Sequence, residues 1–224
     1  MKIDVFNKGS VELLNYTPSG DLLVVNAARC SFDKQHDEFE EGKDDKLIKY
    51  LAKHQHLLPF RHPSATVRIV APLFVLRQLG KHQVGFSWSE VSRRYISDDP
   101  EFHSPLGCWR QAADNVKQGS SLEFIDFPEA IIVDDKLDKF HKDALDLYNS
   151  YLESNICPEQ ARMVLPQSMM TTTVTTGTLL GWQHLYNLRT EDHTQEETQS
   201  YAKAIGELMR NIFPVSWVAL CEHS

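Results

Sequence analysis

The chain has few cysteines, and none of them stands in a Cys-x-x-Cys pair. The four cysteines lie far apart, at positions 30, 108, 157 and 221 of 224 residues. A structural zinc site or a disulfide framework is therefore not expected. The sequence also lacks an apolar run near the roughly 20 residues that span a bilayer, and residues 1–5 do not resemble a signal peptide. We expect a protein of the reducing cytoplasm, without a membrane segment or a metal site.

Positive charge is also scarce, since the net charge is −8. This balance argues against a general nucleic-acid coat, which displaces phosphate counterions with a positive surface. Glycine-rich phosphate loops of the Gly-x-Gly-x-x-Gly or P-loop type are absent, and so is a Gly-x-Ser-x-Gly elbow. A small anionic ligand is still compatible with the sequence where basic side chains cluster locally.

Composition is that of a globular protein, with 42% hydrophobic and 24% charged residues. No repeat or low-complexity linker divides the chain, so we expect residues 1–224 to form one compact α+β domain. The expected strands are a strand or hairpin at 2–17, a partly β-rich apolar segment at 21–28, and a strand at 64–70. Residues 171–176 are ambiguous between strand and helix. Helices are expected at 44–53, from Pro72, at 134–153, 158–163, 179–188 and 194–210, with a long loop at 97–121.

The most informative stretch is residues 77–94, where basic and polar side chains crowd a segment poor in apolar residues. Arginine offers a planar fork of donors that suits phosphate, and Ser92 adds a hydroxyl beside Arg93 and Arg94. Glu90 could hold these arginines in place or accept from a sugar hydroxyl or a base. The alternative is a solvated loop with exposed ion pairs.

Two further features could carry chemistry. Arg162 stands in an apolar run, so we expect it to be partly buried with an anionic partner, either a ligand or a helix carboxylate such as Glu159. His56 and His62 flank a proline turn and could be ligand contacts or ordinary packed histidines. Their spacing does not match a helical metal-ligand pair.

Several ordered motifs together resemble the flavin-dependent thymidylate synthase family. They occur at residues 1–4, 27–32, 56–62, 71–78, 92–95, 109–111 with 117–120, 161–166 and 187–189. The resemblance implies an antiparallel sheet packed with helices, as in thymidylate synthase-complementing proteins. It also implies conversion of dUMP to dTMP with methylenetetrahydrofolate as co-substrate and reduced FAD, regenerated by NADPH, as hydride source. A homotetramer whose sites combine residues from several subunits is expected.

By position, the resemblance assigns dUMP contacts to Gln78, Glu90, Ser92, Arg94, Arg162 and Arg189. Arg189 would stabilise negative charge on the uracil ring. Ser92 would bind and polarise rather than attack, because a serine without an adjacent base is a poor nucleophile. The remaining expected flavin contacts are Ser31, Lys81, His82, Gln83, Glu90, His184 and His193. His56 and Tyr95 would help to position the folate.

The sequence departs from the family in its flavin half. The family signature is Arg-His-Arg followed by seven or eight residues and Ser, whereas this chain has Lys81-His82-Gln83 and then Ser92. Lysine keeps a charge but lacks the bidentate fork. Thr178, Leu180 and His184 stand where the family prefers Asn, Arg and Asn.

These departures leave alternatives open. One is a one-carbon transfer that ends in addition of water and gives 5-hydroxymethyl-dUMP, which needs no hydride. Another is a non-catalytic protein that binds pyrimidine nucleotides on the same scaffold. The sequence leaves dCMP possible in place of dUMP.

Overall fold

A computed structural model describes residues 1–96, 98–113, 121 and 123–223 of the chain. Its centre is a sheet of strands in the order β1-β2-β3-β5-β4, in which every neighbouring pair is antiparallel. The strands are β1 (Lys2–Val5), β2 (Gly9–Tyr16), β3 (Ser64–Pro72), β4 (Phe86–Glu90) and β5 (Met170–Thr178). The expected α+β class with an antiparallel sheet is confirmed.

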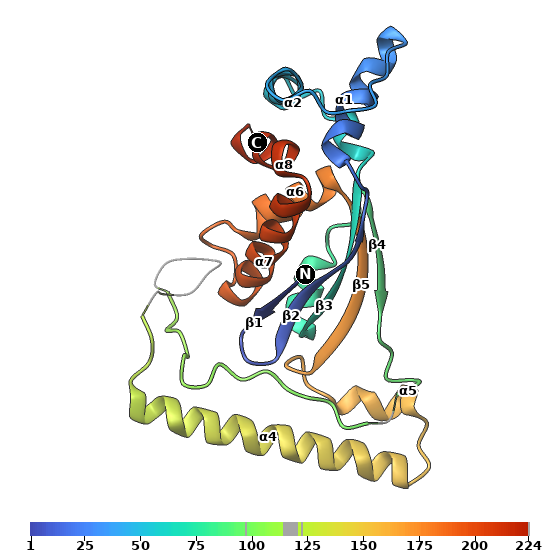
Figure 1. Ribbon diagram of the computed structural model, residues 1–224. Helices are drawn as coiled ribbons and strands as arrows, with labels where there is room; N and C mark the ends of the chain where they lie inside the picture. Colours follow the sequence, from blue (N-terminus) through green and yellow to red (C-terminus); the bar gives the residue numbers. More distant parts are fainter. Residues whose placement is uncertain (97, 114–120, 122, 224) are drawn as a thin grey trace.

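Helices cover one face of this sheet, and the other face is open (Figure 1). The α-helices are α1 (Gly20–Arg29), α2 (Lys43–Lys53), α3 (Leu73–Leu79), α4 (Phe127–Glu153), α5 (Pro158–Ala161), α6 (Leu179–Arg189), α7 (Glu196–Ile212) and α8 (Pro214–Glu222). Short 3-10 helices are η1 (Cys30–Phe32), η2 (Leu58–Arg61) and η3 (Arg162–Val164). Among the described residues, no helix has both the length and the apolarity needed to cross a membrane.

The central pair of strands explains why the sheet has a covered and an open face. Along β3 every second residue is apolar and buried, including Val67 and Ile69. Their antiparallel partners on β5 are Thr175 and Thr173, which are buried as well. Because side chains alternate across a strand, these residues all point to the face that the helices cover.

Edge strand β4 is fastened to the core by aromatic packing. Gly177 on β5 pairs with Phe86, whose ring meets the fully buried ring of Trp182 edge-on at 4.7 Å between centroids. The indole of Trp182 donates to the carbonyl of Ala65 at 3.1 Å. Further along β4, the indole of Trp88 donates to the carbonyl of His82 at 3.0 Å. Phe86, Trp88 and, by alternation, Glu90 therefore face the helices.

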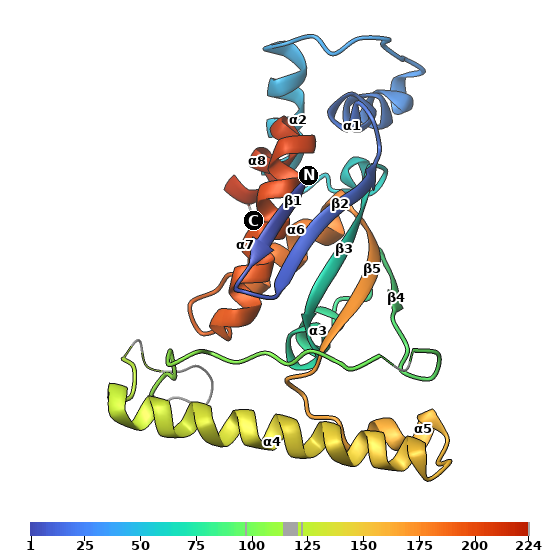
Figure 2. The same ribbon diagram turned by 60° about the horizontal axis from the view of Figure 1, so that its bottom comes forward.

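Helix α4 lies across one end of the sheet, away from the main core (Figure 2). A second, smaller core forms where Tyr148 of α4 packs with Ala161, Leu165 and Met169. A hydrogen bond of 2.7 Å between His141 Nε2 and Ser168 Oγ adds to this attachment. The rest of α4 leaves several large apolar side chains 42–75% exposed: Phe127, Ile131, Ile132, Phe140 and Leu147.

Most of the expected elements are confirmed, including the hairpin at 2–17, the strand at 64–70 and the long helices. The ambiguous threonine segment is strand β5. The β-rich interpretation of residues 21–28 is wrong, since they form α1. β-branched Val24 and Val25 are both fully buried there, so tertiary packing of the helix outweighs their strand preference. Strand β4 and helix α8 were not expected.

Replacing Gly177 tests how tightly β4 is bound to the core. A Cβ at this position would lie 2.4 Å from Phe86 Cε1 and 2.8 Å from Trp182 Cε2. Gly177→Ala should therefore lower the free energy of unfolding by about 1–3 kcal/mol, the usual cost of overpacking. Urea denaturation measures the change. Val174→Ala, on the same strand but 37% exposed, is the control and should cost less. Equal midpoints for Gly177→Ala and the wild type would contradict this packing.

Candidate functional site

The last turn of α6 places the guanidinium of Arg189 against the C-terminal end of α3. Arg189 Nη2 donates to the backbone carbonyl of Gln78 at 2.9 Å, and Nε donates to His82 Nε2 at 3.1 Å. The side-chain amide of Gln78 in turn donates to Gln195 Oε1 at 2.6 Å. The arginine is thus held in one orientation and is partly exposed. Its remaining N–H groups are available to a ligand.

His82 has to be neutral to accept this hydrogen bond, and its surroundings keep it so. Burial, with further contributions from the positive charge of Arg189 and from His184, lowers the pKa of His82 to about 4. Burial also lowers the pKa of His184, and Arg61 adds to that effect. The positive charge that suits an anionic group here therefore comes from Arg61 beside His184 and from Arg189 beside His82, whereas the lowered pKa values keep both histidines neutral.

A second group of polar residues gathers where β4 ends. Burial among neighbouring atoms raises the pKa of Glu90, although the side chain is exposed overall, and the charges of Arg162 and Arg77 counteract this rise. Arg77 belongs to α3, one residue before Gln78. Helix α3 thus connects the Arg189 group with the Glu90 group.

Ser92 and Arg94 follow directly after β4. The Nε of Arg94 donates to Ser92 Oγ at 3.1 Å, and its Nη1 lies 3.7 Å from Glu159 Oε1. The guanidinium also lies over the ring of Tyr95, 5.1 Å from its centroid. Among the described residues no base contacts Ser92, which agrees with binding rather than nucleophilic attack.

The expectation that Arg162 is partly buried is wrong for the single chain. Arg162 is exposed, as is Met163, whereas Ala161 and Leu165 pack inward against the second core. The one-turn helix η3 rotates successive side chains to different sides, so an apolar neighbourhood in sequence did not mean burial. The carboxylate of Glu159 pairs with Arg94, not with Arg162.

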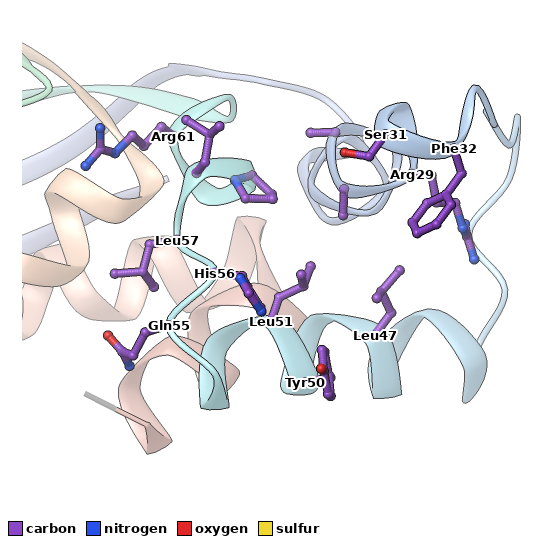
Figure 3. Close-up of a pocket in the computed structure, with 14 residues that line it drawn as sticks. Arg29, Ser31, Phe32, Leu47, Tyr50, Leu51, Gln55, His56, Leu57 and Arg61 are labelled. Atoms are coloured by element: carbon purple, nitrogen blue, oxygen red, sulfur yellow. The ribbon is translucent and has the colours of Figure 1, made fainter.

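A large cavity of about 1000 Å³ lies between α1, α2 and η2 (Figure 3). Its lining is mostly apolar, with Leu47, Tyr50 and Leu51 of α2 on one side and Phe32 opposite. Ser31 and His56, two of the expected contacts, both line it.

One wall of this cavity holds a buried donor without a partner. Arg29 Nη2 bonds the fully buried carboxylate of Asp44 at 2.6 Å, but Arg29 Nη1 is buried and has no hydrogen-bond partner among the described residues. A buried unsatisfied N–H is costly, but this nitrogen exposes less than 1 Å² and is not open to a ligand in the cavity. The mostly apolar lining of the cavity suits a flat, largely apolar ring system.

The other expected flavin contacts are spread over the surface. Lys81 and Gln83 are exposed in the connection between α3 and β4, and His193 is exposed beside Glu191 at 3.0 Å. Of the positions at which the sequence departs from the family, Thr178 accepts from the backbone N–H of Gly181 and caps α6, and Leu180 is 3% exposed. The motif residues 117–120 lie outside the described part of the chain.

Apart from these exposed residues, the expected site residues fall into three places. Gln78, His82, His184 and Arg189 adjoin one another; Glu90, Ser92, Arg94, Tyr95 and Arg162 gather at the end of β4; and Ser31 and His56 line the cavity.

Tyr95 follows the end of β4 and His56 precedes the start of β3. These are opposite ends of the sheet, because β3 and β4 both run antiparallel to β5. The sequence did not indicate the hydrogen bonds of Arg29 with Asp44 and of Gln195 with Gln78, because these partners are remote in the chain.

Comparison with known proteins shows the family of the chain. The model of the family described as thymidylate synthase complementing protein matches residues 12–215. The flavin-dependent thymidylate synthase of Thermotoga neapolitana is 33% identical over 224 residues, covering 100% of this chain and 96% of the relative. The enzyme of the same name from Thermus thermophilus is 34% identical over 223 residues, covering 100% of this chain and 79% of the relative.

A solved structure is similar as well. The UMP/dUMP methylase PolB from Streptomyces cacaoi, bound with 5-Br dUMP, superimposes with a TM-score of 0.85 at 28% identity. The match covers 98% of this chain and 97% of PolB. Fold, motifs and sequence similarity all extend over nearly the whole chain, which therefore belongs to the thymidylate synthase complementing protein family.

Proposed function

We propose that this protein transfers a one-carbon unit from methylenetetrahydrofolate to C5 of dUMP and releases dTMP, with NADPH-reduced FAD as the hydride source. The placement of Arg189 carries the proposal. Its guanidinium is fixed by the carbonyl of Gln78 and by neutral His82, so it is preorganised to stabilise negative charge on a pyrimidine ring. Relatives named flavin-dependent thymidylate synthase and a UMP/dUMP methylase bound with 5-Br dUMP support the substrate and the reacting carbon.

The end of β4 would bind the nucleotide. Ser92, Arg94 and Arg162 supply a hydroxyl and two exposed guanidinium groups, which suit a phosphate dianion. Glu90 would accept a hydrogen bond from a sugar hydroxyl. Gln78, which connects the two groups, would contact the base beside Arg189.

The proposed flavin contacts are Ser31, Lys81, His82, Gln83, Glu90, His184 and His193. The mostly apolar cavity and the positive charges of Arg61 beside His184 and of Arg189 beside His82 fit a cofactor that joins a ring system to phosphates. When bound, FAD would supply the hydride that completes the methyl group. The residues of this chain bind, orient and exclude water.

The folate would be positioned by His56 and Tyr95. Because these two residues lie at opposite ends of the sheet, they could act on one folate only if Tyr95 came from a neighbouring chain. A homotetramer with shared sites is therefore part of the proposal. The exposed apolar side chains of α4 offer the contact surface.

One observation favours a second candidate, the formation of 5-hydroxymethyl-dUMP. Thr178 caps α6 and Leu180 is buried, so neither position offers the polar flavin contact that the family has there. An enzyme without hydride chemistry would need dUMP and the folate but no flavin.

The first test combines product analysis with substitution of Arg189. The wild type, given dUMP, methylenetetrahydrofolate, FAD and NADPH, should form dTMP by mass spectrometry. Arg189→Ala should lower kcat/KM for dUMP by about 100-fold or more, the usual effect of losing one preorganised charge donor. Arg93→Ala, which removes an arginine bonded to the carbonyl of Asp98, is the control and should retain activity.

Three other results are informative. A product heavier than dTMP by one oxygen would replace the main proposal with the second candidate. Full activity of Arg189→Ala would exclude the role given to Arg189. Absence of turnover by the wild type under any reductant would leave only nucleotide binding.

The second test concerns the protonation of His82. Its pKa is about 4 when folded and 6.5 ordinarily, so between these values the unfolded chain binds a proton that the folded chain does not. Stability from this source is complete above pH 6.5 and is lost as the pH falls toward 4. In His82→Gln the decrease in melting temperature over this range should be smaller than in the wild type. His54→Gln, at an exposed histidine, is the control. Parallel curves for His82→Gln and the wild type would contradict a neutral His82.

The third test concerns assembly. A charge at Ile132 or Phe140 of α4 would be buried without a partner in an apolar subunit contact. Ile132→Glu and Phe140→Glu should therefore reduce the mass in light scattering from four chains to one or two and abolish turnover, while circular dichroism is unchanged. Lys53→Glu, at an exposed position of α2 that lies far from α4, is the control. A tetramer that persists in both apolar variants, or a monomeric wild type, would contradict the proposed assembly.

A further inference from the structure

A chain of polar contacts runs from Arg110 to Gln78. Arg110 Nη2 donates to both carboxylate oxygens of Glu197, at 3.0 and 2.8 Å, and Nη1 donates to Glu196. The side chain of Gln195 also donates to Glu197. Gln78 Nε2 donates to Gln195 Oε1 at 2.6 Å. The contacts therefore connect the segment after β4, the start of α7 and the end of α3.

The carboxylate of Glu197 determines which group donates in each hydrogen bond of this series of contacts. Burial raises the pKa of Glu197, but the hydrogen bonds and the positive charge of Arg110, together with a backbone N–H and a smaller contribution from Gln195, outweigh this effect, so the pKa is lowered. An ionised carboxylate only accepts hydrogen bonds. Gln195 must then turn its NH₂ group to Glu197 and its oxygen to Gln78. Gln78 must turn its own NH₂ group to Gln195, which leaves its side-chain oxygen without a partner among the described residues.

The side chains that take part are buried enough to keep each amide in its orientation. The side chains of Arg110 and Glu197 are only 15% and 13% exposed. These two side chains line a cavity of about 330 Å³ together with Gln195 and His103. His103 is only 6% exposed. Hydrogen bonds of charged groups are stronger in such a partly dry setting, so reversal of one amide would be costly.

We infer that Arg110, Glu197 and Gln195 are positioning residues that make Gln78 present an oxygen, and that this oxygen selects uracil over cytosine. The inference rests on the proposed function. A phosphate dianion has no proton to offer, so the oxygen of Gln78 suits a donor on the nucleotide. The backbone carbonyl of Gln78 holds Arg189, the proposed ring contact, which places the amide beside the base. Uracil has an N3–H donor there, whereas N3 of cytosine is an acceptor and would be repelled.

The test is the preference for dUMP over dCMP, measured as the ratio of the two dissociation constants by calorimetry. In Glu197→Gln, the new amide can donate or accept, so Gln195 and Gln78 are free to reverse. The preference should fall about 5- to 10-fold, the usual value of one hydrogen bond, while the affinity for dUMP changes less than about 3-fold. Gln195→Met removes the connection altogether and should have the same effect. Thermal melts verify that both variants fold.

Glu196→Gln is the matched control, because it makes the same change of charge on Arg110 but leaves Glu197 and Gln195 in place. Its preference should equal that of the wild type. An unchanged preference in both Glu197→Gln and Gln195→Met would overturn the inference. The inference would also be overturned if the preference for uracil over cytosine depended on the 3′-hydroxyl, which the 2′,3′-dideoxy forms of both nucleotides lack. If the wild type binds neither nucleotide, the proposed function fails instead.

Discussion

The arrangement of the candidate site depends on how the guanidinium of Arg189 is satisfied. A partly buried arginine needs acceptors, and Arg189 finds them in the carbonyl of Gln78 and in His82, both at the end of α3. This requires a neutral imidazole, and burial with nearby positive charge provides one. Because α3 also carries Arg77, which faces Glu90, one short helix fixes the relation between the proposed base and phosphate ends of the site.

Patterns that depend on local chemistry were predictable from the sequence. Alternation along residues 64–70 predicted β3, helical spacing predicted α2 and α4, and the ordered motifs indicated the family. Strand β4 was missed because its polar residues suggested a loop. Its strand conformation depends on Phe86, which packs against Trp88 and against distant Trp182. Residues 21–28 were misassigned for a similar reason, since their burial in α1 is a tertiary effect.

The residues of the candidate site were assigned from motif positions and stay a prediction, and their geometry was only partly predictable. Motif positions supplied the arginines, yet the exposure of Arg162 follows from the rotation of side chains along η3. Partners that are remote in the chain, such as Gln195 for Gln78 at 117 positions apart, leave no local pattern. The unsatisfied donor of Arg29 has no sequence signal either. Arg162, Tyr95 and several apolar side chains of α4 are exposed in the single chain. The proposed assembly of several chains around one site would give these side chains partners.

Arg189 is the proposed partner of the pyrimidine, and Arg94 and Arg162 are the proposed partners of the phosphate. A crystal structure of the assembled protein with dUMP tests this division most directly. We expect Arg189 and the oxygen of Gln78 to contact the uracil ring, with Ser92, Arg94 and Arg162 around the phosphate, whether from the same or a neighbouring chain. A phosphate bound to Arg189, or a nucleotide bound away from α3, would contradict the account.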